Sequence, residues 1–252
     1  MAVAAERESV AFSEIDSARF GVRVARAQLT SARLAGVLDF CDAQRIELLV
    51  ARCGTSDLEA AQQMEAEGFQ LMDTLLYYSF DLTEKRIPDA QCGVQVRQLQ
   101  PGDEEEIAAI ASAAFQGYVG HYHADRRLDR QQCDEAYRSW AERSCSREAA
   151  DTVLVAEIEG KVEGFGTLRL NSSEEVEGLL FAVAPRSQGR GICPSLMIRS
   201  LEWSRAQGAK RMIISTQVTN VSMQKVWSRT GFEPDHSYYT FHKWFTPEKR
   251  RT

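Results

Sequence analysis

The sequence predicts an α/β protein with two domains, on three observations. Segments with the two-residue period of strands alternate with segments that have the 3.6-residue period of helices. A polar stretch with a proline and a glycine, TEKRIPDAQCG at residues 83–93, separates two such regions. The 252 residues, 44% of them hydrophobic, suffice for one large or two small cores. We therefore expect a small domain over residues 1–88 and a larger one over residues 94–252.

The first region predicts a small α/β domain. Strands are expected at residues 21–27, 46–51 and 70–82, and helices at 29–41 and 57–67. The last of these strands is rich in aromatic residues, as strands often are.

The second region predicts the order β-α-α-β-β-β-α-β-α-β. Strands are expected at residues 94–99, 152–158, 161–170, 176–183, 211–217 and 236–244, and helices at 104–115, 130–144, 190–207 and 220–229. Acidic residues open the helix at 104, where they favour its positive end. Glu159-Gly160 is typical of the turn of a hairpin.

Composition excludes several classes of function. A net charge of −6 argues against nucleic-acid binding, and no apolar run approaches the roughly 20 residues of a membrane span. The charged N-terminal segment does not have the pattern of a signal peptide, so a cytoplasmic location is expected. No CxxC pair occurs among the six cysteines. His121 and His123 form the only metal-ligand alternative, and we expect no metal, because no cysteine or carboxylate cluster flanks them.

Two segments of the chain are similar to each other. Asp57 and Asn220 each precede a glycine-phenylalanine pair by 11 positions, and each segment continues into an aromatic strand, at 77–80 and at 238–241. Capping by Asp or Asn and termination by Gly are common to many helices, so the similarity has a generic alternative explanation. We interpret it as a structural repeat in which the first domain resembles half of the second.

A glycine-containing turn is expected between a strand ending at Val183 and the following helix. Its sequence, VAPRSQGRGIC at residues 183–193, removes side chains at Gly189 and Gly191, so that backbone N–H groups can approach a ligand. Those groups lie at the positive end of the helix, next to Arg186 and Arg190, and together they predict a pyrophosphate site.

This turn resembles the coenzyme A loop of the GNAT superfamily of N-acetyltransferases. Gln188, Gly191 and Cys193 occupy its pattern of Arg or Gln, two residues, Gly, one residue, and Gly or Ala. Cysteine at position 193 departs from that pattern but is small. The resemblance covers about residues 94–245. It implies a mixed, splayed central sheet, acetyl-CoA as co-substrate, and a cofactor site that includes Gln188, Gly189, Arg190, Gly191, Ile192 and Cys193.

The whole chain resembles a narrower, two-domain group, the TDP-fucosamine acetyltransferase type. The segments DSARFG at 16–21 and EAEGFQLMD at 65–73 carry this looser similarity. It implies direct acetyl transfer to a primary amine of a small molecule, and a nucleotide-linked amino sugar is the first candidate. Other small amines and a protein N-terminus or lysine stay open.

The resemblance also assigns the general base. Superfamily members that use a glutamate base carry it at the position of Glu177, and Glu174, Glu175 or a water chain are the alternatives. Even spacing predicts that Glu177 shares a strand face with Leu179 and Phe181.

The backbone of Phe181, Ala182 and Val183 is expected to hold the cofactor. An N–H group there would stabilise the oxyanion, and a bulge commonly splays the sheet at this place in the superfamily, so that the pantetheine arm adds like a strand.

The second element of the family pattern is Asn-x-x-Met-x-x-Val-Trp-x-x-x-Gly-Phe from Asn220. By resemblance Asn220 binds the cofactor, although it also suits a helix N-cap. Trp227 stands where many relatives have a tyrosine that protonates the leaving thiolate, and an indole N–H cannot supply that proton. Trp227 is then expected to pack on the cofactor, with Tyr239 as the acid and Tyr238, Cys193 or water as alternatives.

The acceptor is expected at the aromatic and basic segment over residues 115–130, where Arg126, Arg127 and Arg130 suit phosphates. A second hypothesis is a catalytically degenerate domain that senses coenzyme A, suggested by Trp227 and Cys193. The aromatic strand expected at residues 77–80 is consistent with a homodimer.

Overall fold

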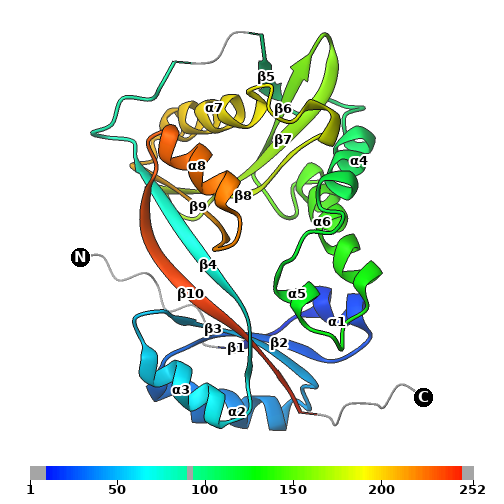
Figure 1. Cartoon of the computed structure of the whole chain (residues 1–252), viewed down its shortest axis with the longest axis vertical. Helices are drawn as coiled ribbons and strands as arrows, with labels where there is room; N and C mark the ends of the chain where they lie inside the picture. Colours follow the sequence, from blue (N-terminus) through cyan, green and yellow to red (C-terminus); the bar gives the residue numbers. More distant parts are fainter. Residues whose placement is uncertain (1–9, 90–92, 246–252) are drawn as a thin grey trace. The chain divides into compact units, whose positions relative to one another are not determined.

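The computed structural model describes residues 10–89 and 93–245 (Figure 1). The strands are β1 Val10–Phe12, β2 Val24–Leu29, β3 Leu48–Gly54, β4 Gln70–Asp81, β5 Gln95–Gln98, β6 Thr152–Ile158, β7 Lys161–Leu170, β8 Glu175–Val183, β9 Arg211–Gln217 and β10 Glu233–Trp244. The helices are α1 Glu14–Phe20, α2 Leu34–Ala43, α3 Leu58–Ala66, α4 Glu104–Ala114, α5 His121–Ala124, α6 Arg130–Cys145, α7 Ile192–Ala206 and α8 Val221–Arg229, with 3-10 turns η1 Ser31–Arg33 and η2 Pro185–Ser187.

The chain forms two compact units. Unit 1 consists of Met1–Leu75, Val119–Cys133 and His236–Thr252, and unit 2 of Leu76–Tyr118 and Asp134–Asp235. The predicted domain boundary at residues 88–94 falls inside unit 2, so the compact units do not coincide with the two predicted domains. The physical reason is strand pairing, because residues 238–244 of β10 pair with β3 and bring the end of the chain into unit 1.

Unit 1 contains a sheet with α2 and α3 on one of its faces and contacts from α1 and α5 on the other. Its strand order is β1-β2-β3-β10-β4, with β2 and β3 parallel and β10 antiparallel to β3. Figure 1 shows α2 and α3 together on one side of these strands. The core between them includes Leu49, Ala51 and Phe241 from the sheet, Val37 from α2 and Met64 from α3. The alternate residues of β2, β3 and β10 therefore lie on the face that these two helices leave free.

Unit 2 contains a sheet with a core on each face. Its strand order is β4-β9-β8-β7-β6-β5. On one face, Leu168, Val176 and Met212 pack with Leu196 and Leu201 of α7. On the other face, Val155, Phe165 and Leu180 pack with Ile107 and Ile110 of α4. Because β8 pairs in parallel with β9 and antiparallel with β7, the sheet is mixed, as predicted.

Strands β8 and β9 separate along their length. They are paired from Glu175–Arg211 to Gly178–Ile214, and of their described residues those beyond this point do not pair with each other. The predicted splay of the central sheet is confirmed. The backbone of β8 from residue 179 to 183 thus has an edge that β9 does not occupy.

Most predicted elements are present. The bounds of β6, β7 and β9 agree with the predicted segments, and the other strands and helices are shifted by a few residues. The first expected strand begins three residues late, because α1 ends only at its C-cap Gly21, which has a left-handed φ of 65°. The sequence analysis left out β1, α1 and α5. Ser13, whose hydroxyl accepts a hydrogen bond from the Asp16 N–H, is the capping signal that could have revealed α1.

The two similar segments have matching local structures. Asp57 and Asn220 are the N-caps of α3 and α8, and each side chain accepts a backbone N–H bond three residues ahead. Both helices have nine residues and are followed by left-handed glycines, Gly68 and Gly231. Twelve-residue strands, β4 and β10, come next. Within the described ranges no helix has both the length and the apolar character that a membrane span requires.

Candidate active site

A turn rich in backbone donors joins β8 to α7. Gly189 and Gly191 take left-handed conformations with φ of 77° and 78°, and Gly191 is the N-cap of α7. In the part of the chain that the structure describes, no backbone carbonyl accepts from the N–H groups between Gln188 and Cys193. Pro194 follows and has no N–H. The unpaired donors and the helix dipole together form a site for an anion the size of a pyrophosphate.

The base of this turn is held by ion pairs of Arg186, one of them to a buried carboxylate. Arg186 forms ion pairs with Glu163 at 3.0 Å and with Glu106 at 3.1 Å. Burial of the Glu163 carboxyl opposes ionisation, but hydrogen bonds from Ser187 and Arg186 outweigh it and lower the pKa of Glu163. Arg186 is therefore occupied in holding the turn, whereas Gln188, Gly189 and Arg190 are exposed to a ligand.

The unpaired edge of β8 presents two backbone N–H groups. The Leu180 N–H donates to the Thr167 hydroxyl at 3.0 Å and the Ala184 N–H to the Glu163 carbonyl at 2.8 Å, so both groups are directed toward β7. Because successive N–H groups of a strand alternate in direction, those of Phe181 and Val183 are directed to the opposite side. There the pairing with β9 has ended.

A bulge in β8 changes the face on which Glu177 lies. Gly178 pairs with Leu168 and Leu180 with Thr167, which leaves Leu179 as an extra residue. Glu177 pairs with Arg169, two positions along β7 from Thr167, whereas Phe181 pairs with Gly166 on the other face. The prediction that Glu177 and Phe181 share a face is therefore wrong, because strand parity shifts by one residue at a bulge.

The three candidate carboxylates have different partners. Glu174 forms an ion pair with Lys210 and Glu175 with Arg211, both at 2.5 Å. Glu177 is half-buried, and its Oε2 accepts a hydrogen bond from Asn171 Nδ2 at 3.0 Å. Among the described residues it forms no ion pair. Glu177 is thus the carboxylate of the three whose charge no cation balances.

Asn220 caps the N-terminus of α8, the role that the sequence analysis gave as the alternative to cofactor binding. Its Oδ1 accepts from the Met223 N–H at 3.3 Å, and its Nδ2 donates to Thr216 Oγ1 at 2.9 Å. An amide nitrogen has a second hydrogen, so Asn220 retains a donor after these two bonds.

Trp227 belongs to the core of unit 2. It is 1% exposed, and its ring lies 5.3 Å from that of Tyr78. Within the described residues its indole N–H has no hydrogen-bond partner. A buried unpaired donor costs about 1–3 kcal/mol, so this N–H calls for an explanation.

The candidate acids lie in different environments. Burial raises the pKa of the Cys193 thiol to about 12, and its sulfur lies 3.7 Å from the sulfur of Met223. Tyr239 packs with Phe241 against the helix-covered face of unit 1. Tyr238, on the opposite face of β10, accepts a hydrogen bond from Gln28 Nε2 at 2.9 Å.

The segment predicted to bind the acceptor is divided between the units. In unit 2, the Phe115 and Tyr137 rings stack at 4.3 Å and Tyr118 meets them edge-on. In unit 1, His121 and Tyr122 are buried on α5, and Arg127 stacks on Trp244 at 4.0 Å.

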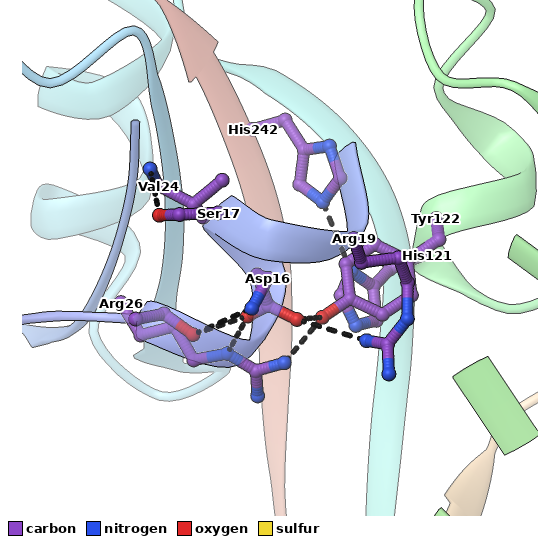
Figure 2. A network of polar contacts seen from close by, with 9 residues as sticks. Asp16, Ser17, Arg19, Val24, Arg26, His121, Tyr122 and His242 are labelled. Carbon is purple, nitrogen blue, oxygen red and sulfur yellow. Dashed lines mark hydrogen bonds and ion pairs between the residues drawn. The ribbon is translucent and has the colours of Figure 1, made fainter. Parts of the chain in front are cut away.

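His121 is part of a buried hydrogen-bonded chain in unit 1. Asp125 Oδ2 lies 2.7 Å from His242 Nδ1, and His242 Nε2 lies 2.9 Å from His121 Nδ1. Next to it, the Asp16 carboxylate accepts from Tyr122 and pairs with Arg26 at 2.6 Å, and Figure 2 shows this network around α1. Among the described residues no group of three or more His, Cys, Asp or Glu side chains is arranged to hold a metal.

Several residues of the site were not singled out in the sequence. Thr167 accepts a hydrogen bond from the Leu180 N–H, and Asn171 donates one to Glu177. Strand register brings the two members of each pair together. Tyr78 was noted only as part of an aromatic strand, although its ring meets Trp227. Register between strands distant in the chain leaves no signal at a single position.

Comparisons with known proteins agree with this geometry. Residues 106–232, half of the chain, match the family described as "Acetyltransferase (GNAT) family". The chain is 30% identical over 145 residues to the spore coat polysaccharide biosynthesis protein SpsD of Bacillus subtilis. This alignment covers 58% of this chain but only 49% of that protein. The chain thus spans about half the length of this relative.

Two further likenesses extend over more of the chain. The dTDP-fucosamine acetyltransferase of Escherichia coli is 25% identical over 235 residues, 90% of this chain and 95% of that protein. A GCN5-related N-acetyltransferase from Sphaerobacter thermophilus has a similar fold, with a TM-score of 0.63 at 15% identity, over 95% of this chain and 77% of that one. The family match includes the donor-rich turn between β8 and α7, and this chain belongs to the acetyltransferase (GNAT) family.

Proposed function

We propose that this protein is an acetyl-CoA-dependent N-acetyltransferase that acts on a primary amine of a small molecule. The observation that carries the proposal is the run of unpaired backbone N–H groups from Gln188 to Cys193 at the start of α7. A pyrophosphate needs several convergent donors and no side chain in the way. Family membership supports the same assignment.

The residues present fit coenzyme A at two places. The turn with Gly189 and Gly191 would hold the pyrophosphate, together with the exposed side chains of Gln188 and Arg190. The free edge of β8 would hold the pantetheine arm through the backbone of Phe181, Ala182 and Val183, as an added strand. Asn220 retains one donor for the cofactor, and Ile192 supports the turn from the core.

Acetyl-CoA, when bound, supplies the acetyl thioester. Glu177 accepts the proton of the attacking amine, either directly or through water, because its charge is not balanced by a cation. The Asn171 amide orients the Glu177 carboxylate. A backbone N–H of Phe181 or Val183 stabilises the oxyanion that forms on the carbonyl.

The proton for the leaving thiolate comes from Tyr239, Tyr238 or water. Cys193 is disfavoured as a donor, since a thiol with a pKa of about 12 is a poorer acid than an ordinary thiol, at about 8.5. Trp227, a core residue with a non-acidic N–H, does not take this role.

For the acceptor we propose a nucleotide-linked amino sugar. Support comes from the names of the two relatives, a dTDP-fucosamine acetyltransferase and a polysaccharide biosynthesis protein. The dTDP-fucosamine acetyltransferase aligns over 90% of this chain, both units included.

The test has two stages. Isothermal titration with acetyl-CoA measures binding, and a panel of amines that includes nucleotide-linked amino sugars, free amino sugars and lysine peptides then measures transfer. Tight binding with transfer to a sugar amine supports the proposal in full. Binding without turnover on any amine would replace it with the coenzyme A sensor, and absence of binding would overturn both.

A further inference from the structure

The face of the unit 1 sheet that α2 and α3 leave free carries a row of polar side chains, and α1 and α5 contact this face at Arg26 and His242. Gln28 of β2 pairs with Arg52 of β3, and Arg52 pairs with Thr240 of β10, so the three lie side by side across the sheet. Tyr238 is two residues from Thr240 and lies on the same face. The neighbouring positions on each strand, Ala27, Ala51 and Phe241 among them, pack against α2 and α3 instead.

Arg52 has no counter-ion on this face. It is half-buried, and among the described residues no carboxylate lies within ion-pair distance of it and no acceptor takes a hydrogen bond from it. The arginine next to it behaves differently, because Arg26 pairs with Asp16 at 2.6 Å and donates to the Tyr122 hydroxyl. A guanidinium that is removed from part of its water and has five free donors is suited to an oxyanion.

Thr240 supplies a second, independent indication. It is fully buried, and its Oγ1 has no hydrogen-bond partner among the described residues. Buried hydroxyls in native proteins are nearly always satisfied by a protein group or by an ordered water, so this hydroxyl has hydrogen-bonding capacity left for a bound molecule. The hydroxyl is on the strand position paired with Arg52, where it could share a ligand with the guanidinium.

Among the described residues, the two carboxylates that contact this face already have partners. The Asp16 carboxylate accepts hydrogen bonds from Arg26, Arg19 and Tyr122, as Figure 2 shows. The Asp125 carboxylate is hydrogen-bonded to His242 and Trp244. Burial, followed by the charges of His242, Arg52 and Arg26, lowers the pKa of His121 well below its usual range. His121 is thus a neutral group in a positive field, to which Arg52 contributes.

We propose that Arg52, with Thr240 and Gln28, binds a phosphate or pyrophosphate group of a small-molecule ligand. The planar guanidinium donates to two phosphate oxygens side by side, and the hydroxyl and amide add neutral donors. All three residues belong to unit 1.

The test uses inorganic pyrophosphate as the probe, in full-length protein that carries Gly191→Val. That substitution closes the coenzyme A turn, so any remaining site is a different one. Isothermal titration compares this background with the same protein carrying Arg52→Gln or Thr240→Val, and with Arg45→Gln as a control. Arg45 is an exposed arginine in a turn of unit 1, so the control removes the same charge from the same unit.

We expect Arg52→Gln to weaken pyrophosphate binding about tenfold or more and Arg45→Gln to leave it unchanged. Thr240→Val removes only an unpaired hydroxyl, so it should weaken binding without loss of thermal stability, which keeps the test valid if Arg52→Gln folds poorly. Equal affinity in all variants, or no binding once Gly191→Val is present, overturns the proposal. Acetate binding as tight as pyrophosphate overturns the assignment to phosphate.

Failure of this site and failure of the proposed function are distinguishable. Loss of pyrophosphate binding in Arg52→Gln does not depend on coenzyme A, so it can be observed even if the wild-type protein does not bind acetyl-CoA. Conversely, a pyrophosphate affinity that Arg52→Gln leaves unchanged would reject the phosphate site and leave the proposed transferase function untouched.

Discussion

Glu177 and Phe181 lie on opposite faces of β8, although they are an even four positions apart in the chain. The extra residue, Leu179, shifts the parity of the strand between the two. Phe181 is thereby directed to the face of α7, where its ring covers Gly166 and Gly178, and a Cβ added at Gly166 would meet the ring at 2.3 Å. Glu177 is directed to the face of α4. The bulge separates the proposed proton acceptor from the ring packed beside α7.

Replacement of Glu177 tests its proposed role as base. Glu177→Gln should lower kcat by about 10²–10⁴-fold while acetyl-CoA still binds. Titration calorimetry and steady-state kinetics on one preparation measure both effects. Glu174→Gln, at an exposed ion pair with Lys210, is the matched control and should keep full activity. An unchanged kcat in Glu177→Gln would assign the proton transfer to water.

The proposed coenzyme A site in the turn between β8 and α7 can be tested through its backbone. Gly191→Val places a β-branched side chain at a φ of 78° among the free N–H groups, so acetyl-CoA affinity should fall by about 100-fold or more. Isothermal titration measures the loss. Gly208→Val imposes similar backbone strain at the other end of α7, at φ 83° with open space around it, and should leave affinity unchanged. If both variants bind equally well, the pyrophosphate lies elsewhere.

The sequence was informative where local chemistry decides structure. Asp57, Asn220 and Gly191 act within a few residues of themselves, so caps and turns could be predicted from spacing alone. Residues whose role depends on strand register could not be predicted in this way. The single extra residue Leu179 reverses the face of Glu177, and no property of leucine signals it. The unpaired state of Arg52 likewise depends on strands that are 188 positions apart in the chain, from Arg52 to Thr240.

The role of Trp227 can be separated into packing and hydrogen bonding. Trp227→Phe keeps a buried ring and removes an N–H that has no partner among the described residues, so stability should change by less than about 1.5 kcal/mol and kcat by only a few-fold. Trp227→Ala should cost about 3–5 kcal/mol by urea unfolding, because it leaves a cavity beside Tyr78. A large loss of kcat in Trp227→Phe, with stability intact, would show that the indole N–H serves the reaction.

The buried histidine of unit 1 predicts how stability depends on pH. Burial, the first cause, and nearby positive charges lower the pKa of His121 in the folded protein, whereas the unfolded chain has a pKa near 6.5. Below pH 6.5 the unfolded state therefore binds the extra proton, and stability falls with pH by about 1.4 kcal/mol per unit. Urea unfolding at pH 7.5 and 5.5 should show that His121→Gln reduces this loss by about 1.4 kcal/mol, while His236→Gln, at an exposed position, keeps the wild-type difference. An equal pH dependence in all three proteins would mean that His121 is protonated in the folded state.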